Sequence, residues 1–200
     1  MTDVSDYKFW DQCYKDNNIG WDLGRVTPVF KKWSDNLKKK SKILVPGAGN
    51  GYDPLYFSNS GHDVTAVDFS NTAVNHMKKR AKKNKISLNI IEYNYFNLLN
   101  LYRNEFDYII EYTFFCAIDP LNRSKYIDVS HKLLKDNGTL IGLFLPLNKQ
   151  TSDGGPPFAV REKEIEAIFS KKFDMINSCY HTLSIEARKG NEKYYEFKKK

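Results

Sequence analysis

The sequence has 200 residues, 41% of them hydrophobic and 14% aromatic, values typical of one folded globular domain rather than of a disordered chain. Its net charge of +7 comes largely from lysine runs, which we interpret as solvated helix faces and a tail rather than a nucleic-acid footprint. We expect a cytoplasmic protein without a signal peptide, membrane span or disulfide framework, because the N-terminus is polar, apolar runs are short and three cysteines are widely spaced.

Short β-branched apolar runs alternate with longer amphipathic stretches, which predicts a doubly wound, mostly parallel sheet with helices on both faces. In chain order the pattern predicts strands over residues 42–46, 63–69, 88–93, 106–112 and 139–145, then two further β-like runs. Helices are predicted over residues 53–60, 72–84, 121–134 and 161–169, the second capped by Ser70 and the third stopped at Asn137-Gly138.

An aromatic-rich helical segment, Tyr7 to Trp33, precedes the first predicted strand. It is too short for a domain and too apolar for a free tail, so we interpret it as a lid with Gly20 as its hinge. No linker divides the chain. We therefore expect a single domain over residues 1–200, with an N-terminal lid segment over 1–41 and a Rossmann-like core over 42–200.

A glycine-rich turn follows the first predicted strand and opens the next helix. The segment VPGAGNGYD carries Gly47, Gly49 and Gly51 at G-x-G-x-G spacing. Glycines let the backbone approach a ligand closely, and the start of a helix offers free N–H groups. A dinucleotide-binding turn has glycine three places after its second glycine, where Tyr52 stands here and would obstruct a pyrophosphate. The spacing therefore favours a methyltransferase over a dehydrogenase.

A carboxylate ends the second predicted strand. Asp68 lies about 20 residues after the first glycine of the turn, where a carboxylate can accept hydrogen bonds from both ribose hydroxyls of an adenosine. A surface aspartate that caps the following helix is the alternative, but Ser70 fits the cap better. We therefore expect Asp68 to bind the ribose of an adenosyl cofactor.

Polar and aromatic side chains follow the next two predicted strands. Asn94 and Tyr95 come after the third strand, where an amide can bond the amino edge of an adenine and an aromatic ring can stack on it. Tyr112 ends the fourth strand, and ligands of open α/β sheets bind at the carboxyl ends of strands. The four histidines form neither a metal set nor a pair with an acid, so we expect no metal and no dedicated general base.

Five segments together resemble the thiopurine methyltransferase family, and in particular its halide/thiol (thiocyanate) methyltransferase branch. They follow the family's order over almost the whole chain: WDLGRVTPVF, VPGAGNGYD, EYTFFCAIDP, GGPPFAV and ARKGNEK. The GGPPF and FFCAIDP segments are specific, whereas the glycine turn is shared by the whole superfamily. The resemblance implies a class I S-adenosylmethionine-dependent methyltransferase, with a seven-stranded sheet, an aromatic helical lid and S-adenosylmethionine as the cofactor.

The resemblance also assigns roles by position. It places the aromatic rings of Trp10, Tyr14 and Trp21 over the sulfonium end of the cofactor, where a cation is favourable. Phe158 matches an aromatic residue of the acceptor pocket, which we expect it to line together with Trp21. The other matching cofactor contacts are Gly47, Gly49, Asp68, Asn94, Tyr95 and Tyr112.

Two positions depart from the family pattern. Tyr14 replaces the usual tryptophan, and Tyr112 stands where thiopurine-type members carry an arginine. The second departure disfavours a thiopurine-like acidic heterocycle as the acceptor. A soft anion or a partly ionised thiol needs no strong base, and the sequence indicates no dedicated one. Glu111 and Tyr112 are the nearest candidates to assist a thiol.

The combined prediction is methyl transfer to a small soft nucleophile: a halide, bisulfide or thiol. Another small-molecule sulfur, oxygen or nitrogen acceptor, such as a thiopurine-like compound, is the first alternative. An RNA-associated cofactor-binding module, suggested by charge alone, is the second. We expect a small molecule or small anion as the substrate, and neither nucleic acid nor membrane as a partner.

Overall fold

The computed structural model describes residues 3–200 and divides into two compact units, one up to Asn97 and one from Leu98. No helix in this described range is long and apolar enough to cross a membrane. The three cysteines are free thiols, and the side chains of Cys13 and Cys116 are buried.

Three parallel strands in the order β3-β2-β1 form the sheet of the first unit. Their bounds are Lys42–Pro46 (β1), Asp63–Asp68 (β2) and Asn89–Glu92 (β3). Apart from their first residues β1 and β2 are buried throughout, as expected for parallel strands inside an α/β layer. The register pairs Pro46 with Val67, so β1 and β2 end at the same edge of the sheet. The glycine turn and Asp68 both lie at this edge.

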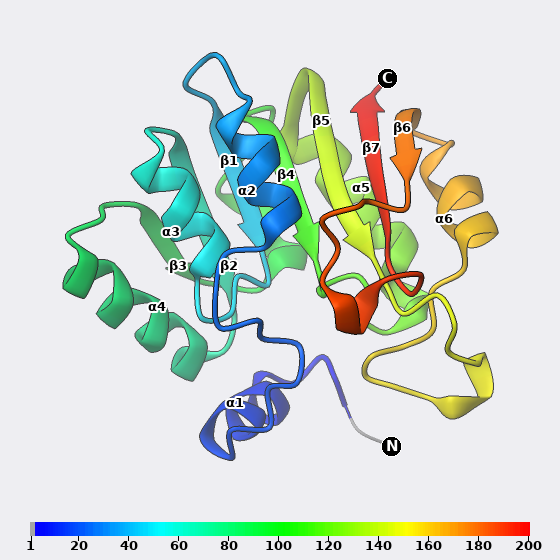
Figure 1. Ribbon diagram of the computed structural model, residues 1–200, viewed down its shortest axis with the longest axis horizontal. Helices are drawn as coiled ribbons and strands as arrows, with labels where there is room; N and C mark the ends of the chain where they lie inside the picture. Colours follow the sequence, from blue (N-terminus) through cyan, green and yellow to red (C-terminus); the bar gives the residue numbers. More distant parts are fainter. Residues whose placement is uncertain (1–2) are drawn as a thin grey trace. The chain divides into compact units, whose positions relative to one another are not determined.

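Four helices belong to the first unit. Their bounds are Tyr7–Lys15 (α1), Pro28–Asp35 (α2), Tyr52–Asn59 (α3) and Asn71–Asn84 (α4). In Figure 1, α2 and α3 lie side by side across β1 and β2. The predicted cap of α4 is confirmed, because Ser70 Oγ accepts a hydrogen bond of 3.2 Å from the Ala73 amide.

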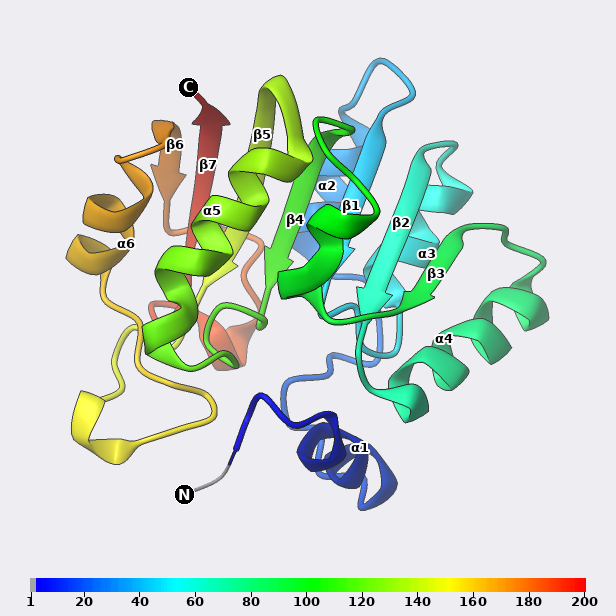
Figure 2. The same cartoon turned by 180° about the vertical axis from the view of Figure 1, so that it is seen from behind.

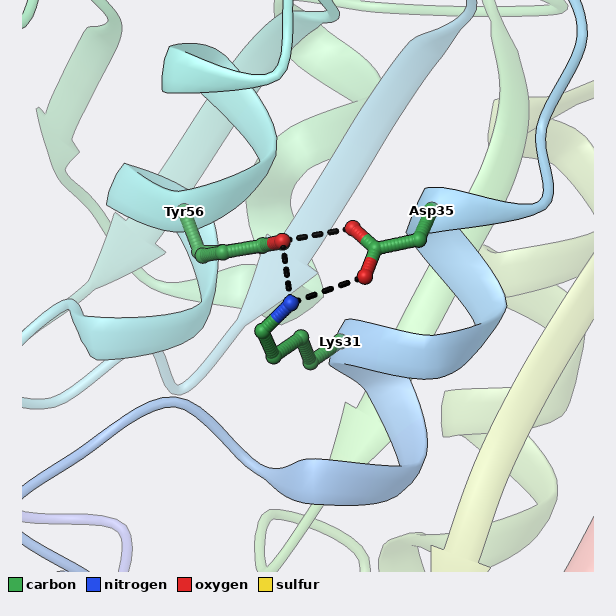
Figure 3. Close-up of polar contacts among 3 residues, drawn as sticks. All are labelled: Lys31, Asp35 and Tyr56. Carbon is green, nitrogen blue, oxygen red and sulfur yellow. Dashed lines mark hydrogen bonds and ion pairs between the residues drawn. The ribbon is translucent and has the colours of Figure 1, made fainter.

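The second helix of the N-terminal segment packs on the helical layer of the first unit. Helix α2 packs on α3: Phe30 is fully buried, and the rings of Trp33 and Phe57 meet edge to face with centroids 5.8 Å apart. An exposed network reinforces this contact, with Lys31 Nζ 2.8 Å from Asp35 and 2.9 Å from the Tyr56 hydroxyl (Figure 3). The apolar face of α2 therefore holds this helix to the helical layer, and the lid segment over residues 1–41 stays a prediction.

The second unit contains four strands in the order β4-β5-β7-β6, with β4 and β5 parallel and β7 antiparallel to both neighbours. Its strands are Phe106–Tyr112 (β4), Leu134–Phe144 (β5), Phe173–Cys179 (β6) and Lys193–Lys199 (β7), and its helices Arg123–Leu133 (α5) and Glu162–Phe169 (α6). In Figure 2, α5 lies across β5. The core is aromatic: Phe169 stacks on Phe197 at 4.1 Å, and Phe115 and Phe144 meet at 5.2 Å.

The end of the helix predicted over residues 121–134 is wrong in one respect. Helix α5 stops at Leu133, and β5 begins at once with Leu134. Asn137, at φ +63°, lies where the pairing with β4 jumps from Phe106–Leu134 to Tyr108–Thr139. The Asn-Gly pair thus lies at an irregularity near the start of β5 and not at the end of a helix. The sequence does not distinguish the two, because both places favour a residue that tolerates positive φ.

Candidate functional site

The glycine turn between β1 and α3 lies in the left-handed region at all three glycines, with φ of +55° at Gly47, +54° at Gly49 and +79° at Gly51. A Cβ on Gly49 would lie 2.8 Å from the hydroxyl of Tyr14, which belongs to α1. Only glycine allows both this backbone and so close an approach. Tyr14 and Gly49, both predicted cofactor contacts, are therefore neighbours.

Asp68, at the end of β2, faces the same turn. Its Oδ2 accepts a hydrogen bond of 2.8 Å from the Gly49 amide, and its Oδ1 one of 2.9 Å from the Ser70 amide. The side chain is buried, 8% exposed. Burial raises the pKa of Asp68 to about 6, against the opposing effect of the amide hydrogen bonds. At neutral pH the group is still an ionised acceptor with lone pairs beyond the two that the amides occupy.

The three predicted N-terminal aromatic residues form one cluster. Trp21 meets Trp10 and Tyr14 edge to face, with ring centroids 5.5 Å and 5.8 Å apart. The Trp10 indole donates to the Val4 carbonyl at 2.9 Å, which fixes its ring. Burial and the negative charge of Asp68 raise the pKa of Tyr14, so its hydroxyl stays protonated.

A polar network beside this cluster was missed in the sequence. Asn50, inside the glycine turn, donates to Asp22 Oδ2 at 2.5 Å, and its Oδ1 lies 3.0 Å from His76 Nδ1 on α4. Arg80 donates to the Asn50 carbonyl at 3.2 Å and stacks over the ring of Tyr52 at 4.0 Å. The network holds the chain after α1 and the middle of α4 to the turn. The one feature of the sequence that points to this network is the position of Asn50 within the glycine motif.

Asn94 and Tyr95, the residues predicted to bind an adenine, follow β3 closely. Asn94 Oδ1 accepts a hydrogen bond of 2.9 Å from the Phe96 amide, which fixes the orientation of the side-chain amide. Tyr95 is 4% exposed, so little of its ring surface is accessible for stacking on an adenine. The neighbouring Phe96 is half-buried, and its ring meets that of Tyr95 edge to face at 6.0 Å.

In the second unit, Glu111 holds the turn after β4. Its carboxylate is 1% exposed and accepts hydrogen bonds from the Phe114 and Phe115 amides at 3.0 and 2.7 Å and from the Tyr126 hydroxyl at 2.8 Å. Burial raises the pKa of Glu111 to about 7. These three internal donors hold the Glu111 carboxylate to the turn, and its assistance to a thiol stays a prediction.

Tyr112 has two charged neighbours that sequence reasoning did not single out. The Arg188 guanidinium carbon lies 4.8 Å from the centre of the Tyr112 ring, and the Tyr112 hydroxyl donates to Glu192 Oε2 at 3.3 Å. Arg188 and Glu192 are 9% and 1% exposed. Both belong to the ARKGNEK segment, one of the five that resemble the thiopurine methyltransferase family. Burial raises the pKa of Glu192, although the charge of Arg188 acts in the opposite direction.

Phe158 is fixed to the segment that follows β4. Its amide donates to the Cys116 carbonyl at 2.7 Å, and a Cβ on Gly155 would lie 2.5 Å from its ring. The half-buried ring therefore rests on the backbone of the Gly/Pro loop, with no side chain between them. Within residues 3–200 no three His, Cys, Asp or Glu side chains gather so as to hold a metal ion.

Comparison with known proteins gives the family. The thiopurine S-methyltransferase family model matches residues 5–200. The chain belongs to the thiopurine S-methyltransferase family. It is 33% identical over 196 residues to the probable thiol methyltransferase 2 of Arabidopsis thaliana, covering 95% of this chain and 84% of the relative. Its identity to the thiocyanate methyltransferase 1 of Brassica oleracea is 32%, with the same coverage.

Solved structures confirm the predicted class I methyltransferase fold with its seven, mostly parallel strands. A Burkholderia thailandensis 1,6-didemethyltoxoflavin-N1-methyltransferase with bound S-adenosylhomocysteine superposes with a TM-score of 0.78 at 17% identity, covering 96% of this chain and 86% of that one. Magnesium protoporphyrin IX methyltransferase from Synechocystis, also with S-adenosylhomocysteine, gives 0.69 at 15% identity over 86% and 80%. Both of these structures hold S-adenosylhomocysteine, the form that S-adenosylmethionine takes once it has given up its methyl group.

The first unit has the donor and acceptor groups that this cofactor requires. The buried, ionised Asp68 can accept from a ribose diol, and the turn around Gly49 presents backbone without a Cβ. The aromatic faces of Trp10, Tyr14 and Trp21 suit a sulfonium cation. The residues present therefore fit S-adenosylmethionine.

Proposed function

We propose that this chain transfers the methyl group of S-adenosylmethionine to a small soft nucleophile: a halide, bisulfide or thiol. Asp68 and the turn around Gly49 hold the cofactor, and the aromatic cluster around Trp21 covers its sulfonium end. The relatives named for thiols and thiocyanate support this acceptor class, since both are about one-third identical over nearly the whole chain.

The Tyr112–Arg188 pair is the observation that carries the proposal. An arginine almost removed from water provides a positive charge beside an aromatic ring, at the carboxyl end of β4. Such a charge attracts small anions, and in a site of low dielectric its effect is stronger than in water. The carboxylate of Glu192, which accepts from the Tyr112 hydroxyl, partly balances the positive charge of Arg188. This favours weakly hydrated anions over strongly hydrated ones.

Methyl transfer requires little of the protein beyond alignment of the two reactants and exclusion of water. Bound S-adenosylmethionine supplies a methyl carbon activated by a positive sulfur. An anion that attacks it neutralises charge, so a dry aromatic environment favours the transition state by removing hydration. A thiol with a pKa of about 8.5 is already partly ionised near neutral pH and needs no strong base.

A second candidate is a thiopurine-like acidic heterocycle, and a specific observation favours it. Tyr112 replaces the arginine of thiopurine-type members, but Arg188 brings a guanidinium to the same ring from elsewhere in the chain. The departure at position 112 is therefore a weaker argument against this acceptor than the sequence suggested. A thiopurine is therefore one of the acceptors to be tested.

The acceptor class is tested by measuring volatile and soluble methylated products with iodide, bromide, bisulfide, methanethiol, thiocyanate and a thiopurine. We expect the highest kcat/KM with one of the soft anions or thiols. With iodide, the rate should be nearly constant from neutral to mildly alkaline pH, whereas with a thiol it should rise toward a pKa of about 8.5. A bell-shaped profile with iodide, or activity confined to catechols, amines or RNA, contradicts the proposal.

Phe158→Ala tests the aromatic wall. Removing the ring admits water and loosens the acceptor, so turnover with iodide should fall at least about tenfold. Affinity for S-adenosylhomocysteine should change little, because the Phe158 ring contacts its own Gly/Pro loop at Gly155. Phe158→Leu, which keeps an apolar group, is the control and should retain most activity. Full activity in Phe158→Ala excludes an acceptor role for the ring.

A further inference from the structure

Helix α1 carries a buried carboxylate that the cofactor site does not explain. Asp11 is 9% exposed and accepts a hydrogen bond of 2.5 Å from the Ser70 hydroxyl and one of 3.0 Å from the Thr72 amide. Burial acts to raise the pKa of Asp11, but these hydrogen bonds outweigh it and the net pKa lies below its ordinary value. Asp11 is therefore an ionised acceptor at the start of α4.

Ser70 joins this carboxylate to the one proposed to bind ribose. Its amide donates to Asp68 Oδ1 at 2.9 Å, and its hydroxyl donates to Asp11 Oδ1. The hydroxyl oxygen in turn accepts from the Ala73 amide at 3.2 Å, which leaves its single proton for Asp11. Ser70 is completely buried, so water cannot replace any of these bonds.

The same helix meets the glycine turn through Tyr14. Asp11 and Tyr14 are three residues apart on α1 and so share one face of the helix. Tyr14 lies against Gly49, whose amide donates to Asp68 Oδ2 at 2.8 Å. Both oxygens of Asp68 are thus connected to α1, one through the turn and the other through Ser70.

We propose that Asp11 and Ser70 are positioning residues that couple the docking of α1 to the cofactor-binding carboxylate Asp68. When α1 docks, Asp11 accepts a hydrogen bond from the Ser70 hydroxyl, and this holds the Ser70 amide in its hydrogen bond to Asp68 Oδ1. Cofactor bound to Asp68 stabilises this arrangement, so that docked α1 and bound cofactor favour each other by the same factor. The inference rests on the proposed role of Asp68 but not on the identity of the methyl acceptor.

Asp11→Ala is the main test, because it leaves Ser70 and its cap of α4 in place. We expect S-adenosylhomocysteine to bind about tenfold more weakly and the KM for S-adenosylmethionine to rise in proportion. The KM for the acceptor should stay the same. Asp16→Ala, which removes an exposed carboxylate at the end of the same helix, is the matched control and should leave both constants unchanged.

Limited trypsin cleavage reports the position of α1 directly. Lys15 and Arg25 are exposed and flank the chain that leaves this helix. S-adenosylhomocysteine should protect both sites several-fold in the wild type and in Asp16→Ala, but not in Asp11→Ala or Ser70→Ala. The thermal stability of Ser70→Ala without ligand reports separately on the lost helix cap.

The outcomes separate the two assignments. If Asp68→Asn binds S-adenosylhomocysteine like the wild type, the role of Asp68 is wrong and the coupling has no basis. If Asp68→Asn binds weakly while Asp11→Ala binds and is protected like Asp16→Ala, only the coupling is overturned. Weak binding and lost protection in both Asp11→Ala and Ser70→Ala support it.

Discussion

Replacing Asp68 by alanine is expected to weaken S-adenosylhomocysteine binding about 100-fold to 10,000-fold, as measured by calorimetry. The variant loses two hydrogen bonds from ribose hydroxyls to a charged acceptor, each worth on the order of 1.5–3 kcal/mol. S-adenosylmethionine should be affected equally, because both ligands share the ribose. Tight binding of NAD, with none of either adenosyl ligand, would overturn the cofactor assignment.

A control is required because Asp68 also accepts from the Gly49 and Ser70 amides, and its removal leaves these donors unpaired. Asp63→Ala removes an exposed carboxylate at the opposite end of the same strand and should leave ligand affinity unchanged. The Tm of ligand-free Asp68→Ala should be compared with that of the wild type. A loss of affinity that is matched by general unfolding does not support the ribose contact.

The pH dependence of binding gives an independent check. With a pKa of about 6, Asp68 is ionised at pH 7 but about nine-tenths protonated at pH 5. Because ribose hydroxyls donate to the ionised form, affinity should fall about tenfold at pH 5. The raised pKa also means that the contribution of Asp68 to the stability of the ligand-free fold decreases as pH rises from about 4 to 6. Asp68→Asn should remove the pH dependence of binding.

The sequence predicts best what depends on neighbouring residues. The strand bounds 42–46 and 106–112 agree with the structure, because each is a short apolar run between turn residues. The Ser70 cap follows from one side chain three residues before the amide it binds. The same reasoning fails at Asn137-Gly138, since a tolerance of positive φ does not distinguish a helix end from an irregular strand entry.

The candidate site shows the same limit. The glycine turn and Asp68 carry their chemistry in residue type and spacing, so both were named from the sequence. Arg188 and Glu192 were not, because Glu192 lies 80 residues from the Tyr112 hydroxyl that it binds and only the fold brings them together. The same limit applies to α2, because an apolar face reveals that a helix is covered, but not by which neighbour.

Gly51→Ala is expected to destabilise the first unit strongly and thereby to disturb the cofactor turn. At φ +79°, a Cβ costs about 1–2 kcal/mol in backbone strain. It would also lie 2.4 Å from Met77 Cγ, and Met77 is completely buried and cannot swing into solvent. Overpacking of this kind adds about 1–3 kcal/mol. Together these effects should lower the Tm by about 5–15 °C, measured by thermal unfolding.

Gly61→Ala separates the two causes. Gly61 has a similar backbone, at φ +92°, but nothing lies within 4 Å of its Cβ position. This variant should therefore lose only the backbone contribution, about 1–2 kcal/mol of unfolding free energy. Met77→Ala in the Gly51→Ala background should recover part of the extra destabilisation that Gly51→Ala shows over Gly61→Ala. The methyl group added at position 51 then enters the space that the Met77 side chain leaves. Equal destabilisation in Gly51→Ala and Gly61→Ala would show that contact with Met77 does not determine why glycine stands at the third position of the turn.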